Sequence, residues 1–251
     1  MSMSLDLIVV SSSLEPVDAA AVSALEQRLG MPMPLGYADF MATYGQGSVC
    51  NAFDVWGPTR ILDSLDGMRE MWAEYWFWKH PELGQADFAD AVPVGGSSDG
   101  DQLALVPGRG LVMLPRHSDE AIDVGTSYSD AVRWFCTSGR LVVASEVLWF
   151  ASWTRQSCYE NWAGGELDRV RDAISDLEMH VAEEASGADA STFLIPAMGG
   201  HVSVLRPSGD AELYVHVRFE PEFAALHARI EAALIGTAAR RMARWGAEPV
   251  T

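Results

Sequence analysis

Three short, β-rich stretches separated by tight glycine-containing turns constrain the middle of this sequence more than any other feature. They are Ala91–Gly95, Gln102–Val106 and Leu111–Pro115, with SSDGD and PGRG between them. Turns of this length and composition connect neighbouring antiparallel strands, because glycine adopts the backbone angles that such turns require. The sequence therefore predicts an antiparallel β-meander over these residues. A further short strand is expected at Leu5–Val10.

Helical patterns precede and follow the meander in the sequence. Apolar residues recur at helical spacing in several segments, and a serine or threonine is in place to cap the last of them. The expected helices are Val17–Leu29, a short helix around Tyr37–Tyr44, Leu65–Lys79 and Ser127–Phe135. The stretch from Cys50 to Asp63 predicts a strand, a turn at Gly57-Pro58 and another extended piece. Residues 1–150 are therefore expected to form one α+β domain, an antiparallel meander flanked by helices.

Residues 151–251 predict a second series of helices and strands. A strongly charged amphipathic helix, a β-hairpin and a long second helix follow one another. The segments are Gly164–Glu184, the strands His201–Leu205 and Glu212–Phe219 around the turn RPSGD, and Glu222–Trp245, with SGADAS as a flexible link. Arg240, Arg241 and Arg244 lie at the end of the last helix, where positive charge complements the helix dipole. We therefore expect a helix–hairpin–helix extension of unknown role, which can pack on the first domain.

The net charge excludes some partners and favours others. The chain carries 17 basic and 35 acidic side chains and a net charge of −18, of which the first 150 residues hold −12. A nucleic-acid backbone is bound by clustered lysine and arginine, and an anionic membrane surface repels an acidic protein. We therefore expect no direct nucleic-acid binding, no membrane docking and a partner with a basic surface.

Other features of the sequence bear on the compartment. The amino-terminal residues lack the positive start and the long apolar run of a secretory signal. The apolar-rich stretch Leu141–Trp153 contains Glu146 and is shorter than the roughly 20 residues of a membrane span. Cys50, Cys136 and Cys158 are few, odd in number and without CxxC spacing, which is typical of reduced thiols in the cytosol. The expected location is cytoplasmic.

One catalytic motif occurs literally in the sequence. Gly96-Ser97-Ser98-Asp99-Gly100 fits GxSxG, the nucleophile elbow of α/β-hydrolases. That motif needs a strand before the serine and a helix after it. The residues that follow, QLALVPGRG, predict a strand and a turn instead. We therefore interpret the motif as a hairpin turn.

Histidines and cysteines form no strong pattern for a metal or a nucleophile. No two of the six histidines have the close helical spacing of metal-ligand pairs. His180 with Glu183 and Glu184 could hold a metal on a helix, although a solvated acidic face explains them more simply. A nucleophilic pair such as Cys158 with His201 stays open from the sequence. We expect no catalytic residues, no metal and no cofactor, and hence a protein that is not an enzyme.

The segment Leu65–Lys79 is unusually aromatic for a helix. Its large side chains are Met68, Met71, Trp72, Tyr75, Trp76 and Trp78. A helix rich in tryptophan and methionine usually buries that face, so core packing is the favoured interpretation. A ligand pocket is the alternative.

Acidic side chains gather on the predicted loops of the meander. They are Asp99, Asp101, Asp119, Glu120 and Asp123. Asp99 and Asp101 flank Gly100, where they can bind a cation or, as we favour, cap the turn through neighbouring backbone amides. The five residues form the candidate partner-binding face, although solvation without a partner explains each of them as well.

An ordered series of motifs resembles the SUKH superfamily, the Smi/Knr type, over about residues 15–140. The motifs are LEQRLGMPMPLGYADFMATYGQG (Leu25–Gly47), Trp56-Gly57-Pro58 with Ile61-Leu62, VPVGGSSDGDQLAL (Val92–Leu105), the strand Leu111–Pro115 and the helix Ser129–Phe135. Met33 stands where that family commonly has leucine, and Gly36 occupies a usually polar position. The tryptophan-rich stretch Trp72–Trp78 is longer than a minimal family domain needs, and residues 151–251 have no counterpart in the resemblance.

The resemblance implies an α+β domain that binds proteins. Bacterial members look like immunity proteins that neutralise toxins, often nucleases or deaminases, and fungal relatives act as scaffolds in cell-wall signalling. A nuclease needs a basic substrate groove, so an acidic inhibitor would be steered to it and could cover it. The function expected from the resemblance is neutralisation of a cognate toxin by direct binding.

Two other functions stay open from the sequence, and the oligomeric state is also open. One is an enzyme or small-ligand binder with a site between the two halves, built from the tryptophan-rich helix and the face His180–Glu184. The other is a regulatory scaffold without a toxin partner. Neither can be separated from toxin neutralisation by the residues alone.

Overall fold

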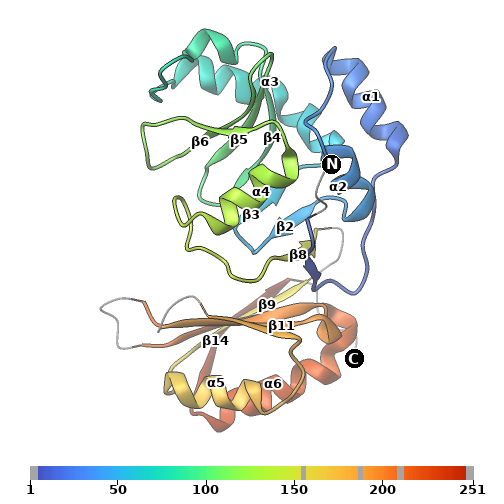
Figure 1. Ribbon diagram of the computed structural model, residues 1–251. Helices are drawn as coiled ribbons and strands as arrows, with labels where there is room; N and C mark the ends of the chain where they lie inside the picture. Colours follow the sequence, from blue (N-terminus) through green and yellow to red (C-terminus); the bar gives the residue numbers. More distant parts are fainter. Residues whose placement is uncertain (1–4, 154–156, 186–188, 208–211, 247–251) are drawn as a thin grey trace. The chain divides into compact units, whose positions relative to one another are not determined.

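The chain folds into two compact units, each with helices and strands (Figure 1). The structure is a computed structural model and describes residues 5–153, 157–185, 189–207 and 212–246. The first unit comprises Met1–Leu7 and Leu14–Ala144, and the second comprises Ile8–Ser13 and Ser145–Thr251. Mixed helices and mainly antiparallel strands confirm the expected α+β class. The expected division at residue 150 leaves Ile8–Ser13 in the first part, whereas this segment belongs to the second unit.

The strands of the first unit lie in the order β2-β3-β4-β5-β6-β7, each antiparallel to the next. They are β2 (Gly47–Val49), β3 (Phe53–Val55), β4 (Val92–Ser97), β5 (Gln102–Val106), β6 (Gly110–Leu114) and β7 (Ile122–Gly125). The helices are α1 (Ala19–Leu29), α2 (Tyr37–Thr43), α3 (Pro58–Glu74) and α4 (Tyr128–Thr137), with a 3-10 turn, η1, at Gln85–Phe88. The expected meander is therefore confirmed as β4-β5-β6, and β7 extends it.

Both faces of the meander are buried. Ala104 of β5 and Val112 of β6 pack in one cluster with Trp72 of α3. Side chains alternate between the two faces of a strand, so Leu103 and Met113 point to the opposite face, and both are fully buried. This explains why the strands of the meander are almost continuously apolar.

Helix ends follow the sequence signals in part. Gly30 ends α1 in the left-handed conformation, and the Ser127 hydroxyl caps α4 by accepting a hydrogen bond from the Asp130 amide. The extended piece expected after Gly57 is wrong, because α3 begins at Pro58. A proline is tolerated in the first turn of a helix, where its missing N–H has no partner to lose.

The second unit is a six-stranded antiparallel sheet with two α-helices, together with a parallel pair of short strands. The parallel pair is β1 (Ile8–Val9) with β8 (Trp149–Ser152). The sheet has the order β10-β11-β12-β13-β9-β14, and its strands are β9 (Cys158–Ala163), β10 (Ala182–Ala185), β11 (Ala190–Ile195), β12 (Gly200–Leu205), β13 (Tyr214–Phe219) and β14 (Arg240–Gly246). The helices are α5 (Leu167–Ser175) and α6 (Ala224–Gly236), with 3-10 turns η2 (Pro196–Met198) and η3 (Pro221–Phe223).

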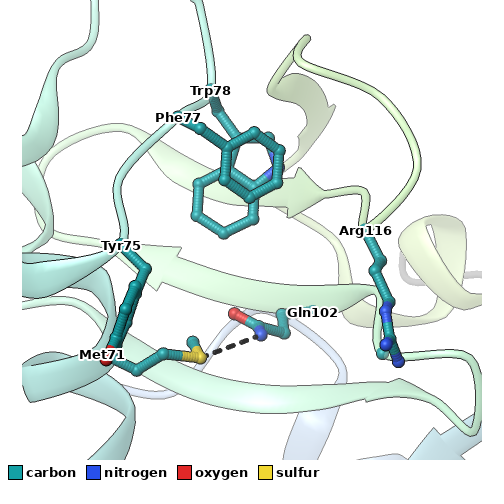
Figure 2. A pocket seen from close by; sticks show the side chains of 7 residues that line it. Met71, Tyr75, Phe77, Trp78, Gln102 and Arg116 are labelled. Atoms are coloured by element: carbon teal, nitrogen blue, oxygen red, sulfur yellow. Dashed lines mark hydrogen bonds between the residues drawn. The ribbon is translucent and has the colours of Figure 1, made fainter.

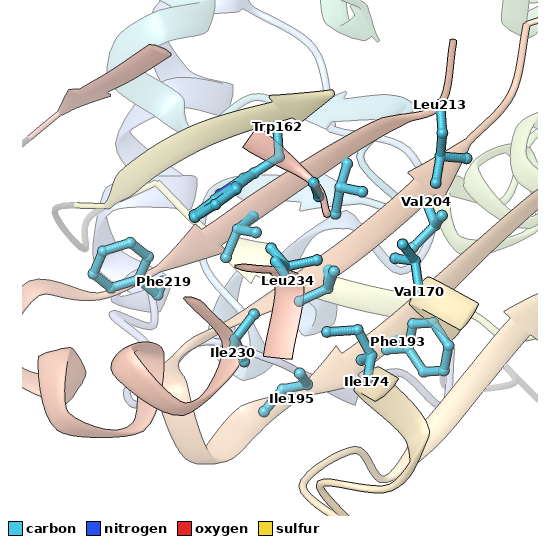
Figure 3. Packing of buried hydrophobic residues seen from close by; sticks show 14 of the residues in the cluster. Trp162, Val170, Ile174, Phe193, Ile195, Val204, Leu213, Phe219, Ile230 and Leu234 are labelled. Carbon is cyan, nitrogen blue, oxygen red and sulfur yellow. The ribbon is translucent and has the colours of Figure 1, made fainter. Parts of the chain in front are cut away.

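Helices α5 and α6 cover the same face of this sheet (Figure 1). Figure 3 shows the resulting core, in which apolar side chains of both helices meet those of the strands. Ile174 of α5 and Ile230 of α6 belong to one buried cluster with Trp162 and Phe219 of the strands. The expected hairpin is confirmed, since β12 and β13 pair with His201 opposite Arg218. Its turn lies partly outside the described residues, as does the SGADAS link.

Both long helices expected in this part are confirmed over α5 and α6, but each is shorter than predicted. Helix α5 ends at Ser175, and Glu178 follows with a positive φ of 51°; α6 ends at Gly236, and Ala238 follows with a positive φ of 66°. Such residues reverse the chain direction rather than continue a helix. In each case the chain returns as an edge strand, β10 or β14.

The arginines expected to cap the last helix lie on β14 instead. Arg240 pairs with Glu212, whereas Arg241 and Arg244 pair with a buried carboxylate of β9, that of Glu160. Glu160 is fully buried; its Oε1 lies 3.0 Å from Arg241 Nη1 and 3.4 Å from Arg244 Nε. Its Oε2 lies 3.0 Å from His227 Nε2 of α6 and accepts a 3.1 Å hydrogen bond from Trp162 Nε1. A buried charge requires such partners. The arginines therefore hold the edge strand β14 in place.

We expect Gly95→Ala to destabilise the first unit and Gly67→Ala to stabilise it. A Cβ at Gly95 would lie 2.6 Å from Phe53 Cζ and 2.8 Å from the Asp54 carbonyl oxygen, an overpacking that costs about 1–3 kcal/mol. Gly67 is in the middle of α3 with no atom within 4 Å of a new Cβ, so alanine gains about 0.5–1 kcal/mol. Urea unfolding of both variants measures the difference. Equal effects would contradict the close approach of β3 and β4.

We also expect the second unit to lose stability as the pH falls from 6.5 to about 3. Burial, assisted by the Arg218 cation, lowers the pKa of His201 from 6.5 to about 3, so the unfolded chain binds a proton that the folded chain excludes. The free energy of unfolding should fall by up to about 1.4 kcal/mol per pH unit in this window. His201→Phe should flatten this slope in urea titrations at successive pH values. An unchanged slope would show that His201 is not buried in the neutral form.

Candidate protein-interaction site

The five acidic residues expected to form a partner-binding face divide into two groups. Asp99 and Asp101 lie on the turn between β4 and β5. Asp119 and Glu120 lie between β6 and β7, and Asp123 is on β7. Asp101 is buried, whereas Asp99, Asp119, Glu120 and Asp123 are exposed. The surface they make is therefore two acidic loops rather than a single face.

Asp101 belongs to the fold rather than to the surface. Its side chain is buried, and its carboxylate accepts a 2.7 Å hydrogen bond from the Ser97 hydroxyl and a 2.9 Å bond from the Arg116 amide. The Asp101 amide in turn donates to the Ser97 hydroxyl oxygen at 3.1 Å. The carboxylate thus ties the β4–β5 turn to the end of β6, in agreement with the interpretation that it caps the turn.

Ion pairs engage the second acidic group. Lys79 Nζ pairs with Asp119, and Arg109 bridges Asp123 and Glu82. The hydrogen bond from Lys79 lowers the pKa of Asp119, and the hydrogen bond from Arg109 lowers the pKa of Asp123. Both carboxylates are therefore ionised at neutral pH, but much of their charge is compensated locally.

His80 fixes the loop that carries this group. Its Nδ1 accepts hydrogen bonds of 3.1 Å from the amides of Glu82 and Leu83, which leaves the proton of the neutral ring on Nε2, 3.3 Å from Asp123 Oδ2. A hollow of about 490 Å³ lies beside it, lined by Lys79, His80, Pro81, Asp119, Glu120 and Ala121. The hollow is therefore rimmed by both signs of charge.

The aromatic segment after α3 is not helical, and buried and exposed side chains alternate along it. Trp76 and Trp78 pack on the buried cluster, and the Trp78 indole donates a 2.6 Å hydrogen bond to the Pro115 carbonyl. Tyr75 and Phe77 are 67% and 47% exposed. Helix α3 ends at Glu74, so the helix expected to continue to Lys79 is wrong over its last five residues. Core packing is thus confirmed for the tryptophans, while two large aromatic rings face outward.

These exposed rings border a pocket of about 270 Å³ (Figure 2). Its lining residues are Met71, Tyr75, Phe77, Trp78, Gly100, Gln102 and Arg116. The rings of Phe77 and Trp78 stack with centroids 4.2 Å apart and form one wall. In Figure 2, Gln102 lies between Met71 and Arg116 with the stacked rings opposite. Helix α3, strand β5 and the loop after β6 each contribute to this pocket.

One feature of the sequence, the position of Phe77, indicates an exposed ring in this segment. On a helix continued to Lys79, Phe77 would fall opposite the stripe formed by Trp72 and Trp76. An aromatic residue outside the apolar stripe is either exposed or not helical, and Phe77 is both. Gln102 and Arg116 carried no such signal, because their positions depend on the pairing of β5 with β6.

The catalytic patterns weighed from the sequence do not assemble. Ser98, the serine of the GxSxG match, lies in the turn of the β4–β5 hairpin, and a strand rather than a helix follows it. Cys158 pairs with Phe219 and His201 pairs with Arg218, so the two side chains point to opposite faces of the sheet. His180 is not on a helix, and its neighbour Glu183 pairs with Arg171 at 3.1 Å; the Glu184 side chain lies outside the described residues.

Comparison with known proteins adds no relative. No protein-family model matches this sequence, and a search of curated proteins finds no match. Within the described ranges, no helix is long and apolar enough to cross a membrane, and no group of three or more His, Cys, Asp or Glu residues could hold a metal ion. The candidate site is therefore defined by its surface: two exposed aromatic rings, a pocket and acidic loops.

We expect Asp101→Ala to destabilise the first unit while Asp99→Ala leaves its stability nearly unchanged. The first change removes a buried acceptor from the Ser97 hydroxyl and the Arg116 amide, which costs about 1–3 kcal/mol. Asp99 is exposed, and surface changes of this kind stay within about 0.5 kcal/mol. Thermal unfolding of the two variants measures the difference. A stable Asp101→Ala protein would return Asp101 to the candidate partner-binding residues.

Proposed function

We propose that this chain is a non-enzymatic protein-binding protein of the immunity type, which neutralises a bacterial toxin by direct binding through its first unit. The observation that carries the proposal is the pair of exposed aromatic rings, Tyr75 and Phe77, beside a pocket and acidic loops. Most large apolar side chains of this unit are buried, so these two rings are an unusual exposure. Aromatic residues in a pocket surrounded by polar groups are typical of the centre of a protein interface.

The charge of the first 150 residues, −12, favours a partner with a basic surface. Exposed Asp99 and Glu120 lie on the two acidic loops of the site, where they would act as rim charges. Rim charges mainly raise the rate of encounter, whereas the affinity comes from the desolvated anchors at the centre. A nuclease or deaminase toxin fits this description, because its nucleic-acid groove must be basic.

The resemblance of residues 15–140 to the SUKH superfamily supports the same proposal. Its bacterial members look like immunity proteins, and that role places the protein in the cytoplasm of the cell that it protects. The absence of an assembled nucleophile among Ser98, Cys158 and His201 supports a role without catalysis. A scaffold function without a toxin partner rests on the same surface and is separated from toxin neutralisation by the experiment below.

Co-expression of the full chain with the toxin encoded next to it is expected to restore growth of cells that the toxin alone kills. Purified chain and toxin should associate at a rate that falls steeply as salt is added, because attraction between their charges is screened. Growth that is not restored, together with no measurable complex, would contradict toxin neutralisation; binding of another protein through the same surface would favour the scaffold function.

A matched pair of variants tests the role of the acidic loops. Asp99→Asn with Glu120→Gln should slow association several-fold at low salt, with little change in dissociation. Glu15→Gln with Asp63→Asn removes the same charge from exposed residues that do not line the site and should have a smaller effect. Stopped-flow fluorescence measures both rates. Equal slowing by the two pairs would assign steering to the net charge rather than to these loops.

A further inference from the structure

The side-chain amide of Gln102 forms the floor of the aromatic pocket, and a hydrogen bond from the Trp72 indole determines its orientation. Trp72 Nε1 lies 2.6 Å from one amide atom of the Gln102 side chain. An indole N–H can only donate, so this atom must be the oxygen, Oε1. The NH2 group of Gln102 therefore occupies the other position, on the side of Met71 and the pocket (Figure 2).

That NH2 group has a weak partner within the protein. Its contact is the Met71 sulfur, 3.7 Å from Gln102 Nε2, and a thioether is a poor acceptor. An amide carries two N–H donors, and sulfur satisfies at most one of them weakly. The pocket floor can therefore donate a hydrogen bond to an acceptor that enters from solvent.

The guanidinium of Arg116 provides donors on the opposite side of the pocket. The Arg116 side chain is exposed and lies over Gly100, where a Cβ would approach its Cδ to 2.9 Å, and Nη1 donates to the Asp99 carbonyl oxygen at 3.1 Å. Gly100 has a positive φ of 97°, so the turn itself requires glycine and leaves this space for the arginine. One hydrogen bond uses a single N–H of the five in the fork.

Charge and shape together restrict what the pocket can receive. Tyr75, Phe77 and Trp78 provide apolar walls, and the polar groups between them, Gln102 and Arg116, present donors. A lysine or arginine anchor would meet the Arg116 cation. A carboxylate anchor would have to approach a part of the chain, residues 1–150, whose net charge is −12. An apolar ring accompanied by a neutral hydrogen-bond acceptor matches both the apolar walls and the donors of the pocket.

We propose that the pocket lined by Tyr75, Phe77, Gln102 and Arg116 receives one aromatic side chain of the partner protein, and that a main-chain carbonyl beside that side chain accepts hydrogen bonds from Gln102 Nε2 and Arg116. This inference rests on the proposed function, because it names the anchor of the same interface. The volume, about 270 Å³, suits a single ring. Ring stacking on Phe77 and the directed carbonyl bond supply affinity, whereas the acidic rim charges mainly raise the rate of encounter.

The pocket can be tested without the partner by using small amides as probes. N-acetyl-L-tryptophanamide and N-acetyl-L-phenylalaninamide each combine a ring with neutral carbonyls, and N-acetyl-L-lysinamide is the cationic control. Titration of the ¹⁵N-labelled full chain should shift the Gln102 NH2 and Trp78 Nε1 resonances with the aromatic amides and not with the lysine amide. Tyr75→Ala with Phe77→Ala should remove the shifts, whereas Val143→Ala, another exposed apolar residue, should keep them. No shift, or equal shifts with all three amides, would overturn the proposal.

Binding to the toxin then separates this inference from the proposed function. Phe77→Ala and Gln102→Glu should each weaken the complex about tenfold or more, as expected for central anchors, while Val143→Ala leaves it unchanged. Gln102→Glu keeps an oxygen for the Trp72 indole but replaces the NH2 donor, so the fold is retained. Wild-type affinity in both variants overturns the pocket proposal and leaves toxin neutralisation standing. No toxin binding by the wild-type chain overturns the proposed function and the anchor with it.

Discussion

The hydrogen bond from the Trp72 indole to Gln102 organises the candidate site. Trp72 is buried between α3 and the meander, and its 2.6 Å bond joins that helix to β5. Because the Gln102 amide oxygen accepts the hydrogen bond from the indole, the Gln102 NH2 group faces the pocket. Helix α3 ends at Glu74, and in the segment that follows Trp78 is buried while Phe77 is exposed and stacks on its ring. This buried contact thus orients the floor of the pocket, while the hydrogen bond from Trp78 to the Pro115 carbonyl holds its wall.

In the second unit the corresponding constraint is a buried charge rather than a neutral hydrogen bond. Glu160 is fully buried on β9, where Arg241, Arg244 and His227 surround it. Removing one partner of such a group is costly because a buried charge is left uncompensated, although the whole network gains little over apolar packing. The network therefore specifies where β14 pairs more than it adds stability. Arg241 and Arg244 therefore have a structural role in the second unit, and the proposed binding site is on the first unit.

Local signals predicted part of this fold, and tertiary contacts decided the rest. The β4–β5–β6 meander and the Ser127 cap follow from turn glycines and a capping hydroxyl, which act within a few residues. Local patterns could not exclude helices beyond Ser175 and Gly236, because strand β10 forms by pairing with β11, which is unknown from the sequence, and β14 forms by pairing with β9, which is distant in sequence. The acidic loop residues of the candidate site could be predicted from the sequence, but Asp101 is buried. Gln102 and Arg116 meet only through strand pairing, so no sequence pattern revealed their shared pocket.

The central claim is that the first unit binds its partner through the aromatic pocket and the adjacent acidic loops. Hydrogen–deuterium exchange of the full chain, alone and saturated with the toxin, tests this claim most directly. Slower exchange on binding is predicted for amides in residues 75–80, 98–102 and 116–120, which carry the rings, the pocket floor and the acidic rim. Slower exchange confined to residues 145–251, with no change in those three segments, would contradict it.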